Sequence, residues 1–404
     1  MNTIQPINKS VIVFLVLLMG PISGVTIDLY APSLPAITHY FSTTDTLAQL
    51  TMTVYLFGYG LCQSFYGSIS DSFGRRGALI FGLFFYVICS LMAPLSHSIH
   101  TLLFIRFLQG VAMGGPGVIS KSIASDVFEG MALRKVTTYM TIAWALGPIV
   151  APAIGGYLQV YFGWHAAFYF MAVYGFIITM LVMFYLPETN NNRNPFQFKP
   201  IVDSYKMILS NKIFLGSVML LALTYSLMTV FNVVGPFLIQ NVLGFSPIFF
   251  GHIALLLGLA WFVGNVSNRL LITRMHTHHI IGVNLLIGLI VAIAMLVMAL
   301  MEHMTVFSIV APTVLLFITG AIVFPNSFGN ALSLFPKLGG SASASLGSLC
   351  IVGAGIMSGI ASLLKTKSQI PLSIIYIGLM VISIVFYVIF LQKTFKRELS
   401  PPAQ

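Results

Sequence analysis

Long apolar stretches alternate with short polar breaks along the whole chain. A helix that crosses the roughly 30 Å of bilayer hydrocarbon needs about 20 apolar residues, and each stretch is long enough. The first stretch follows Lys9 as a signal peptide would, but it continues past Asp28 without a small-residue cleavage site. We therefore predict an all-α membrane protein with twelve transmembrane helices. The predicted spans are 11–36, 46–66, 78–96, 101–122, 136–158, 165–186, 213–238, 248–272, 280–301, 305–330, 342–364 and 370–391.

Positive charges collect at every second connection between the predicted spans. Short cytoplasmic loops hold the Lys and Arg excess of a membrane protein. The alternate connections hold only Lys365 and Lys367. This distribution predicts an even number of spans with both termini in the cytoplasm. The charged connections contain Lys9, Arg75, Arg76, Arg134, Lys135, Arg193, Lys199, Lys206, Lys212, Arg274, Lys337, Lys393, Lys396 and Arg397.

The longest polar break divides the chain into two halves of six spans each. It is polar and contains proline, as a linker does. We predict an N-terminal half at 1–190, a cytoplasmic linker at 191–212 and a C-terminal half at 213–404.

The two halves resemble one another at two equivalent places. Residues 28–32 (DLYAP) match residues 232–236 (NVVGP), and residues 67–71 (GSISD) match residues 264–268 (GNVSN). Internal duplication is typical of transporters whose halves rock around a central site. The alternative is coincidence in helices that are rich in small residues.

Composition supports the membrane assignment and excludes other classes. Of the 404 residues, 58% are hydrophobic and only 7% are charged, against roughly a quarter charged in soluble proteins. The net charge of +10 could suggest nucleic acid, but the basic residues lie at the ends of apolar runs and form no single patch. His276, His278 and His279 lie in a polar loop without a partner acid or cysteine, so we predict no metal site.

The loop between the second and third spans, residues 67–76 (GSISDSFGRR), resembles the signature loop of the major facilitator superfamily. The resemblance implies a fold of twelve helices in two six-helix halves and a conformational gate at this loop. Glycine lets helices approach closely, aspartate accepts hydrogen bonds from a helix N-terminus, and arginine anchors the membrane edge. The expected gate residues are Gly67, Asp71, Gly74, Arg75 and Arg76.

Further stretches narrow the resemblance. Residues 106–110 (RFLQG) are similar to the superfamily's RxxQG motif, and residues 147–156 (GPIVAPAIGG) to the motif of its drug:proton antiporters. With residues 30–35 (YAPSLP), 164–168 (WHAAF) and 187–189 (PET), they resemble the bacterial Bcr/CflA multidrug-efflux branch. The resemblance covers most of the first half and is thin in the second. Ser125-Asp126 and Trp164-His165 stand where that branch often has Arg-Asp and Trp-Arg.

The fifth span carries glycine and proline at close spacing. Membrane helices tolerate both because neighbouring groups satisfy the freed backbone and small residues allow close packing. We predict a kinked, tightly packed face there, which either serves packing alone or also acts as a hinge or a seal against proton leak. The residues concerned are Gly147, Pro148, Pro152, Gly155 and Gly156.

Two charges stand out within the predicted spans: Asp28 in the first and Arg106 in the fourth. A charge in a bilayer costs several kcal/mol, so intramembrane ionisable residues usually serve function. Burial disfavours an ionised carboxyl and a nearby guanidinium favours it. We predict that Asp28 titrates and that Arg106 is its electrostatic partner. The alternative is a static ion pair, or an arginine whose guanidinium is capped by carbonyl groups.

Aromatic and polar side chains in the spans could line an adaptable substrate cavity. In a chain with 33 Phe and 16 Tyr, the alternative is that most of them face lipid or core. The candidates are Tyr30, Tyr55, Tyr59, Gln109, Trp144, Tyr225 and Asn232.

The sequence favours a proton-coupled secondary transporter that exports drugs or other amphipathic small molecules across the bacterial inner membrane. No Walker-type GxxxxGK[ST], HExxH or GxSxG pattern is present, so we expect no enzyme, no ATP hydrolysis and no cofactor. The expected partners are a small molecule, protons and the lipid bilayer, with the protein a monomer. Alternatives are export of an endogenous metabolite such as a siderophore, uptake by symport, or a non-transporting membrane sensor or scaffold.

Overall fold

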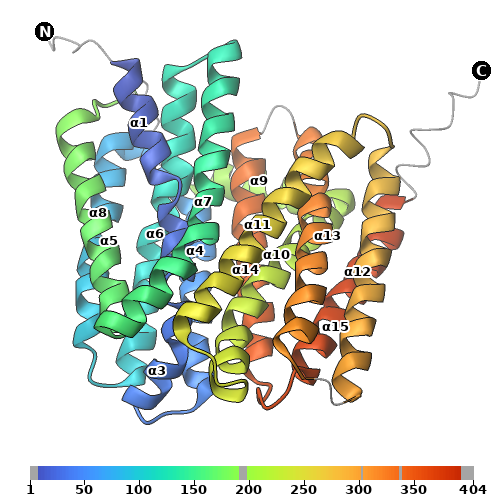
Figure 1. Ribbon diagram of the computed structural model, residues 1–404. Helices are drawn as coiled ribbons and strands as arrows, with labels where there is room; N and C mark the ends of the chain where they lie inside the picture. The colour runs from blue at the N-terminus through green and yellow to red at the C-terminus, as the bar shows by residue number, and fades with distance from the viewer. Residues whose placement is uncertain (1–7, 191–197, 302–303, 336–338, 393–404) are drawn as a thin grey trace, which may run out of the picture. The chain divides into compact units, whose positions relative to one another are not determined.

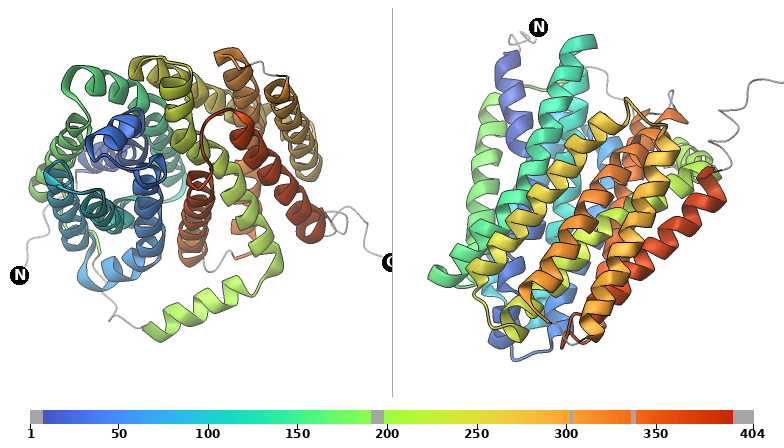
Figure 2. Two further views of the ribbon diagram at one scale, coloured as in Figure 1. Left: turned by 90° about the horizontal axis from the view of Figure 1, so that it is seen from below. Right: turned by 45° about the vertical axis from the view of Figure 1, so that its right-hand side comes forward.

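The protein is a bundle of long helices in two compact units, residues 1–201 and 202–404. This computed structural model describes residues 8–190, 198–301, 304–335 and 339–392. Within each unit the helices run side by side (Figure 1), and a view along them shows each bundle nearly end-on (Figure 2). Residues 191–197 of the predicted linker lie outside the described residues, and residues within 198–212 form a short helix, α9.

The first unit contains six spans. Its first span is interrupted, whereas the other five are long helices. The elements are α1 (Lys9–Met19), α2 (Ile22–Asp28), η1 (Ala31–Ser33), α3 (Leu34–Tyr40), α4 (Asp45–Phe73), α5 (Arg75–Met92), η2 (Ala93–Leu95), α6 (Ile99–Val127), α7 (Gly130–Phe162) and α8 (His165–Tyr185).

The second unit contains the other six spans. Its first span continues beyond the α-helix as a π-helical turn, and its last span ends in the same way. The elements, including the connecting helix, are α9 (Phe198–Leu209), α10 (Lys212–Pro236), η3 (Phe237–Val242), α11 (Pro247–Leu271), α12 (Thr277–Leu300), α13 (Val306–Ser333), α14 (Gly339–Ser362), α15 (Ile370–Phe386) and η5 (Tyr387–Gln392).

Local sequence accounts for where several spans begin. A hydroxyl or amide side chain accepts hydrogen bonds from the first free backbone N–H groups of a helix. Thr44 does so for α4, Ser98 for α6 and Asn211 for α10. Gly74, with φ of 97°, separates α4 from α5, a conformation that favours glycine.

Proline explains the interruption of the first span. Pro21 has no N–H to donate, so it cannot continue the hydrogen-bond ladder of α1. The chain turns at Gly20 and resumes as α2. The hydroxyl of Tyr174, on α8, donates a hydrogen bond of 2.7 Å to the Leu18 carbonyl next to the break. The predicted span 11–36 is present, and these elements together make one apolar stretch, Lys9–Tyr40, that is long enough to cross a membrane.

Twelve helical spans in two halves confirm the predicted fold class. Among the described residues, eleven helices are long and apolar enough to cross a membrane. The twelfth span is α4, which carries more polar residues. Several of them are buried inside the unit, including Gln49, Thr51 and Thr53.

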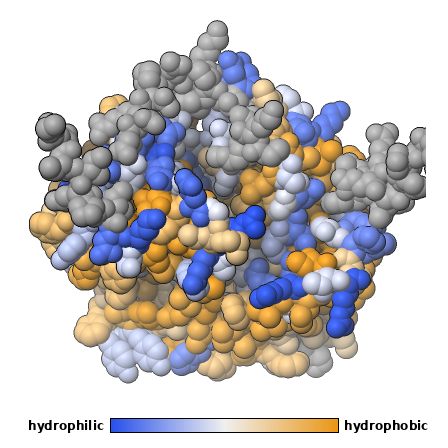
Figure 3. All heavy atoms as spheres, turned by 90° about the horizontal axis from the view of Figure 1, so that it is seen from above, coloured by the Kyte–Doolittle hydropathy of each residue, from blue (hydrophilic) through white to orange (hydrophobic). Residues whose placement is uncertain are grey.

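Large apolar side chains cover the outward faces of the helices. Phe81, Phe104 and Phe184 are each more than half exposed, as expected of residues whose solvent is lipid. Seen from above, hydrophilic side chains lie among hydrophobic ones on the end of the molecule that faces the viewer (Figure 3). Exposed large apolar side chains on helices long enough to span a bilayer are those of a multi-pass membrane protein.

Candidate functional site

The guanidinium of Arg106 lies at the centre of the polar core of the first unit. Arg106 is completely buried on α6. Its Cζ atom lies 4.4 Å from the ring centroid of Tyr30, 4.5 Å from that of Tyr55 and 5.7 Å from that of Phe168. Aromatic faces attract a cation, and the attraction is stronger where water is excluded. The rings therefore stabilise a charge that the bilayer would otherwise disfavour.

Hydrogen bonds fix the orientation of this arginine. Its Nη1 donates to Gln109 Oε1 at 2.5 Å, and its Nη2 donates to the Thr26 carbonyl at 3.3 Å. Gln109 in turn donates from Nε2 to the Ser90 hydroxyl at 2.7 Å. Residues of α2, α5 and α6 thus hold one guanidinium. We call Thr26, Tyr30, Tyr55, Arg106, Gln109 and Phe168 the Arg106 cage.

Asp28 belongs to the chain segment that touches the cage. It is the last residue of α2 and is 2% exposed. Thr26, two residues before it, and Tyr30, two residues after it, both contact the Arg106 guanidinium. The Tyr30 hydroxyl also forms a hydrogen bond of 2.5 Å with Thr51 on α4. A direct ion pair between Asp28 and Arg106 stays a prediction.

Three of the predicted cavity residues, Tyr30, Tyr55 and Gln109, gather around Arg106. Tyr59 follows on α4, with its ring 6.1 Å from that of Tyr55. Trp144 lies on α7, where its backbone nitrogen would be 3.2 Å from a Cβ placed on Gly20.

Tyr225 and Asn232 belong to α10 in the second unit. Both are at least 95% buried. Tyr225 lies 6.2 Å from Phe324, measured between ring centroids.

The predicted gate loop forms an ionic cluster around Arg75. Arg75 pairs with Asp71 through Nη1 and with Asp126 at 3.0 Å through Nε. Its Nη1 also donates to the Ser70 hydroxyl at 2.8 Å. Because Asp126 is the next-to-last residue of α6, this arginine connects the ends of three helices, α4, α5 and α6.

The residues that follow the sixth span close the same cluster. Glu188 accepts hydrogen bonds from the backbone N–H groups of Arg75, at 2.9 Å, and Arg76, at 3.3 Å. Thr189 donates to Asp126 at 3.0 Å, and Asn190 donates to the Asp71 carbonyl at 2.9 Å. We call residues 188–190 the latch.

Sequence reasoning assigned no chemical role to the latch. Glu188 entered only as part of the PET resemblance. The available signal was Glu188 itself, an acidic residue directly after the sixth span. A carboxylate is favoured next to the N-terminus of a helix, so it could have been expected to bind the start of a neighbouring span such as α5.

Of the other gate residues, Arg76 makes a contact to another helix, whereas Gly67 does not lie at a close helix contact. Arg76 donates from Nη2 to the Met183 carbonyl on α8 at 2.7 Å. Gly67 was predicted to allow close helix approach, yet a Cβ there would meet only Val118, at an ordinary 3.7 Å. The close approach of α4 and α6 lies elsewhere, at Gly58 and Gly110, where a Cβ would overlap backbone oxygen atoms of the facing helix.

Glycine and proline of α7 pack directly against α2. A Cβ on Gly155 would overlap the carbonyl oxygen of Leu29, and one on Gly147 would lie 2.7 Å from the carbonyl oxygen of Pro21. The nitrogen of Pro148 would lie 3.0 Å from a Cβ on Gly24. Pro152 and Gly156 are buried on the same helix. Close packing in this region therefore requires small residues on both helices.

The second unit has a neutral pair at the position that matches Asp71. Asn268, on α11, accepts a hydrogen bond of 2.7 Å from Asn326 on α13. Asn330 of α13 also donates to the Ser217 hydroxyl on α10 at 2.9 Å. In the second unit, hydrogen bonds between neutral side chains therefore join α13 to α11 and to α10.

The sequence model of the Major Facilitator Superfamily matches residues 16–358, most of the chain. The chain belongs to the Major Facilitator Superfamily. Within this superfamily, the chain is similar to bacterial resistance proteins. It is 26% identical over 397 residues to the bicyclomycin resistance protein homolog of Haemophilus influenzae, covering 96% of this chain and 99% of that protein.

A second relative is also named as a resistance protein. Multidrug resistance protein D of Escherichia coli is 25% identical, with 93% of this chain and 94% of that protein covered. The fold is also that of solved transporters. The xylose transporter XylE from E. coli superposes with a TM-score of 0.73 at 14% identity, covering 95% of this chain and 97% of that one.

Proposed function

We propose that this protein is a proton-coupled secondary transporter that exports drugs or other amphipathic small molecules across the bacterial inner membrane. Family membership and the names of the two resistance-protein relatives support export of small molecules. The observation that carries the proton coupling is the Arg106 cage, because it holds a permanent cation beside the segment that contains Asp28. Arginine does not release its proton in proteins.

In this proposal Asp28 exchanges the proton and Arg106 tunes the exchange. An ionised carboxylate is favoured near a guanidinium and disfavoured by burial alone. A conformational change that alters the hydration or separation of the two groups therefore changes proton affinity. Substrate that displaces the pair would release the proton to one side. Proton entry down its gradient would then drive substrate export.

The aromatic part of the cage suits a site that accepts varied molecules. Tyr30 and Tyr55 present flat apolar rings with a polar tip, and small-molecule sites are lined mostly by hydrophobic and aromatic side chains with a few polar groups. Tyr59 extends the same row along α4. We propose that amphipathic substrates contact these rings.

We further propose that the ionic cluster and the latch stabilise one conformation of the transport cycle. Arg75, Asp71 and Asp126 would hold the cytoplasmic ends of neighbouring helices together. The free energy of substrate and proton binding would then have to exceed the stabilisation from these ion pairs before the conformation changes. The orientation expected from the Lys and Arg distribution places this cluster, and both chain termini, on the cytoplasmic side. We propose a monomer as the functional unit.

The test is substrate-driven proton movement in liposomes of purified protein under an imposed pH gradient. Asp28→Asn is expected to abolish transport driven by the gradient while substrate binding persists. Asp45→Asn is the matched control, because Asp45 is an exposed carboxylate at the start of α4. If Asp28→Asn exchanges protons for substrate at the parent rate, another group carries the coupling and the proposal fails.

A further inference from the structure

Five buried residues of the first unit form a closed circuit of hydrogen bonds that begins and ends at Arg106. Arg106 donates to Gln109, and Gln109 donates to the Ser90 hydroxyl. The Ser90 hydroxyl donates to the Tyr86 carbonyl at 2.8 Å. The Tyr86 hydroxyl lies 2.7 Å from the Thr26 hydroxyl, and the Thr26 carbonyl accepts from Arg106. All five residues are completely buried, and we call them the hydrogen-bond circuit.

The number of available protons fixes the direction of the hydrogen bonds in this circuit. A hydroxyl group has one proton to donate. Thr26 donates its proton to the Ile22 carbonyl at 2.6 Å, so its oxygen accepts and the Tyr86 hydroxyl donates. Ser90 donates its proton to the Tyr86 carbonyl, so it accepts from the Gln109 amide. Tyr86 therefore supports the circuit at two points, once as a donor and once as an acceptor.

The Ser90 hydroxyl determines which end of the Gln109 amide faces Arg106. A side-chain amide has an NH₂ donor at one end and a carbonyl acceptor at the other. Because Ser90 accepts, the NH₂ group of Gln109 faces Ser90 and its oxygen faces the guanidinium. The reverse orientation would place donors against donors. Residues of α5 thus orient the side-chain partner of Arg106.

The aromatic ring of Tyr86 is held in place by α8. A Cβ on Gly175 would lie 2.8 Å from two atoms of that ring and 3.1 Å from a methyl group of Val87. Contacts of 2.8 Å are too short for a side chain at this position, so the close approach of α8 requires glycine. The ring therefore has little freedom to move, and its hydroxyl stays directed at Thr26 on α2.

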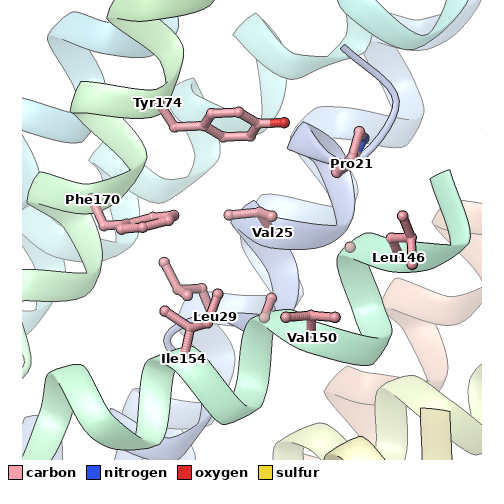
Figure 4. A pocket seen from close by; sticks show the side chains of 10 residues that line it. Pro21, Val25, Leu29, Leu146, Val150, Ile154, Phe170 and Tyr174 are labelled. Atoms are coloured by element: carbon pink, nitrogen blue, oxygen red, sulfur yellow. The ribbon is translucent and has the colours of Figure 1, made fainter. Parts of the chain in front are cut away.

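The hydrogen bond from Tyr86 gives α2 a directional contact, whereas the side of α2 that faces α8 is loosely packed. There Val25 and Leu29 point into an apolar crevice of about 240 Å³, which side chains of α7 and α8 complete (Figure 4). An apolar cavity of about 150 Å³ already accommodates benzene, and apolar contact is non-directional. Tyr86 instead binds one atom of Thr26, two residues before Asp28 on the same short helix.

We propose that Tyr86 is a positioning residue for proton coupling, which acts on Arg106 through Thr26 and Gln109. Tyr86 has this role only if, as proposed above, Arg106 tunes proton exchange by Asp28. The interaction between two charges depends on their separation, so the guanidinium must occupy one position whenever the proton is exchanged. Without the Tyr86 hydroxyl the guanidinium takes other positions as well, and part of the substrate crosses without proton exchange.

The experiment measures two fluxes in the same liposomes of purified full-length protein under an imposed pH gradient. Radiolabelled chloramphenicol, a neutral amphipathic drug, reports substrate, and an entrapped pH-sensitive dye reports protons. Tyr86→Phe removes only the hydroxyl. We expect the ratio of protons to drug to fall about two- to tenfold, the equivalent of one hydrogen bond. The pH midpoint should stay unchanged, because the variant changes no charge.

Tyr387→Phe is the matched control for the loss of a buried tyrosine hydroxyl. Tyr387 lies in the second unit, is buried and donates a hydrogen bond of 2.8 Å to the His278 carbonyl. A variant that is only less stable loses both fluxes in proportion, so its proton-to-drug ratio should equal that of the parent. Ser90→Ala breaks the other part of the circuit at Gln109 and should lower the ratio as Tyr86→Phe does. It provides the test if Tyr86→Phe does not fold.

A double-mutant cycle tests the path through Thr26. Thr26→Val removes the hydroxyl that accepts from Tyr86 and preserves the shape of the side chain. We expect the same ratio in Thr26→Val, in Tyr86→Phe and in the double variant, because each change breaks the same hydrogen bond. Independent effects that multiply in the double variant would overturn the proposal, since Tyr86 would then act at another place.

The proton-to-drug ratio also separates this proposal from the proposed function. If the parent protein couples the two fluxes and Tyr86→Phe keeps the parent ratio, the positioning role is wrong and the proposed function stands. If the parent protein moves chloramphenicol without protons, or does not move it, both fail.

Discussion

Oε1 of Glu188 accepts a hydrogen bond of 2.9 Å from the backbone N–H of Arg75, a residue 113 positions earlier in the chain. The other carboxylate oxygen accepts from Arg76. One side chain at the end of the sixth span thus satisfies the N-terminus of the third. A carboxylate at this position also complements the positive end of the α5 helix dipole. The latch therefore connects the end of the sixth span to the junction of α4 and α5, which lies more than 100 residues earlier in the chain.

Replacing Glu188 tests this capping role. Glu188→Ala removes both hydrogen bonds and the charge, and we expect a loss of about 0.5–2 kcal/mol of stability, the usual value of a helix cap. Glu188→Gln should lose less, because the amide oxygen still accepts a hydrogen bond. Thermal unfolding in detergent measures both. Glu129→Ala is the control, since Glu129 precedes α7 without a side-chain capping bond; equal effects at the two positions would argue against the cap.

The Arg75 and Asp126 pair predicts energetic coupling between α5 and α6. Arg75 is 8% exposed, so removing Asp126 takes one of two carboxylate partners from a largely buried cation. We expect Arg75→Gln and Asp126→Asn each to lower the unfolding temperature, and the double variant to lose less than the two losses combined. The coupling should be about 0.5–3 kcal/mol, the range for residues in one network. Strict additivity in this double-mutant cycle would show that the contact contributes nothing.

Glycine-to-alanine variants test whether a glycine is needed for close helix packing or only belongs to a sequence motif. Gly155→Ala would place a methyl group on the Leu29 carbonyl oxygen, and overpacking costs roughly 1–3 kcal/mol. Gly77→Ala meets nothing within 4 Å and should stabilise α5 by about 0.5–1 kcal/mol. Gly67→Ala should be tolerated in packing terms despite its place in the signature loop. Unfolding temperatures of the three variants check the order, and a stable Gly155→Ala would contradict the close-packing argument.

Hydrophobic pattern alone was enough to predict twelve spans, because lipid imposes length and apolarity on every one of them. Helix ends were less predictable. α4 extends to Phe73, beyond the predicted limit at 66, and α7 begins at Gly130 instead of 136. Polar residues at these ends lie outside the hydrocarbon, where hydropathy gives no signal that the helix continues. The same reasoning missed α9.

The site was predictable where its partners share a helix or a motif. Gln109 follows Arg106 by three residues, so both lie on one face of α6, and Arg75 follows Asp71 by four residues in one sequence motif. Thr26 and Phe168 contact Arg106, and Ser90 contacts Gln109. These three residues come from three other helices, and no sequence spacing indicates the contacts. Tertiary packing alone brings these residues together. The same holds for Glu188.

The Arg106 cage gives the last prediction, which concerns pH dependence. Gln109→Glu would place a carboxylate beside the guanidinium, at the position where Gln109 Oε1 now lies 2.5 Å from Arg106. The new charge would pair with Arg106 and repel an ionised Asp28. A like charge changes the balance between the protonated and ionised carboxyl, so the pH dependence of substrate-driven proton release should change.

Gln109→Leu is the matched control for this charge effect. Leucine also removes the hydrogen bonds to Arg106 and Ser90, but it adds no charge. It should therefore slow transport without changing its pH profile. The measurement is proton release on substrate addition to purified protein across a pH series. Unchanged midpoints in Gln109→Glu would mean that the cage does not influence the coupling group, since a carboxylate so close to Arg106 must change the field at any titrating neighbour.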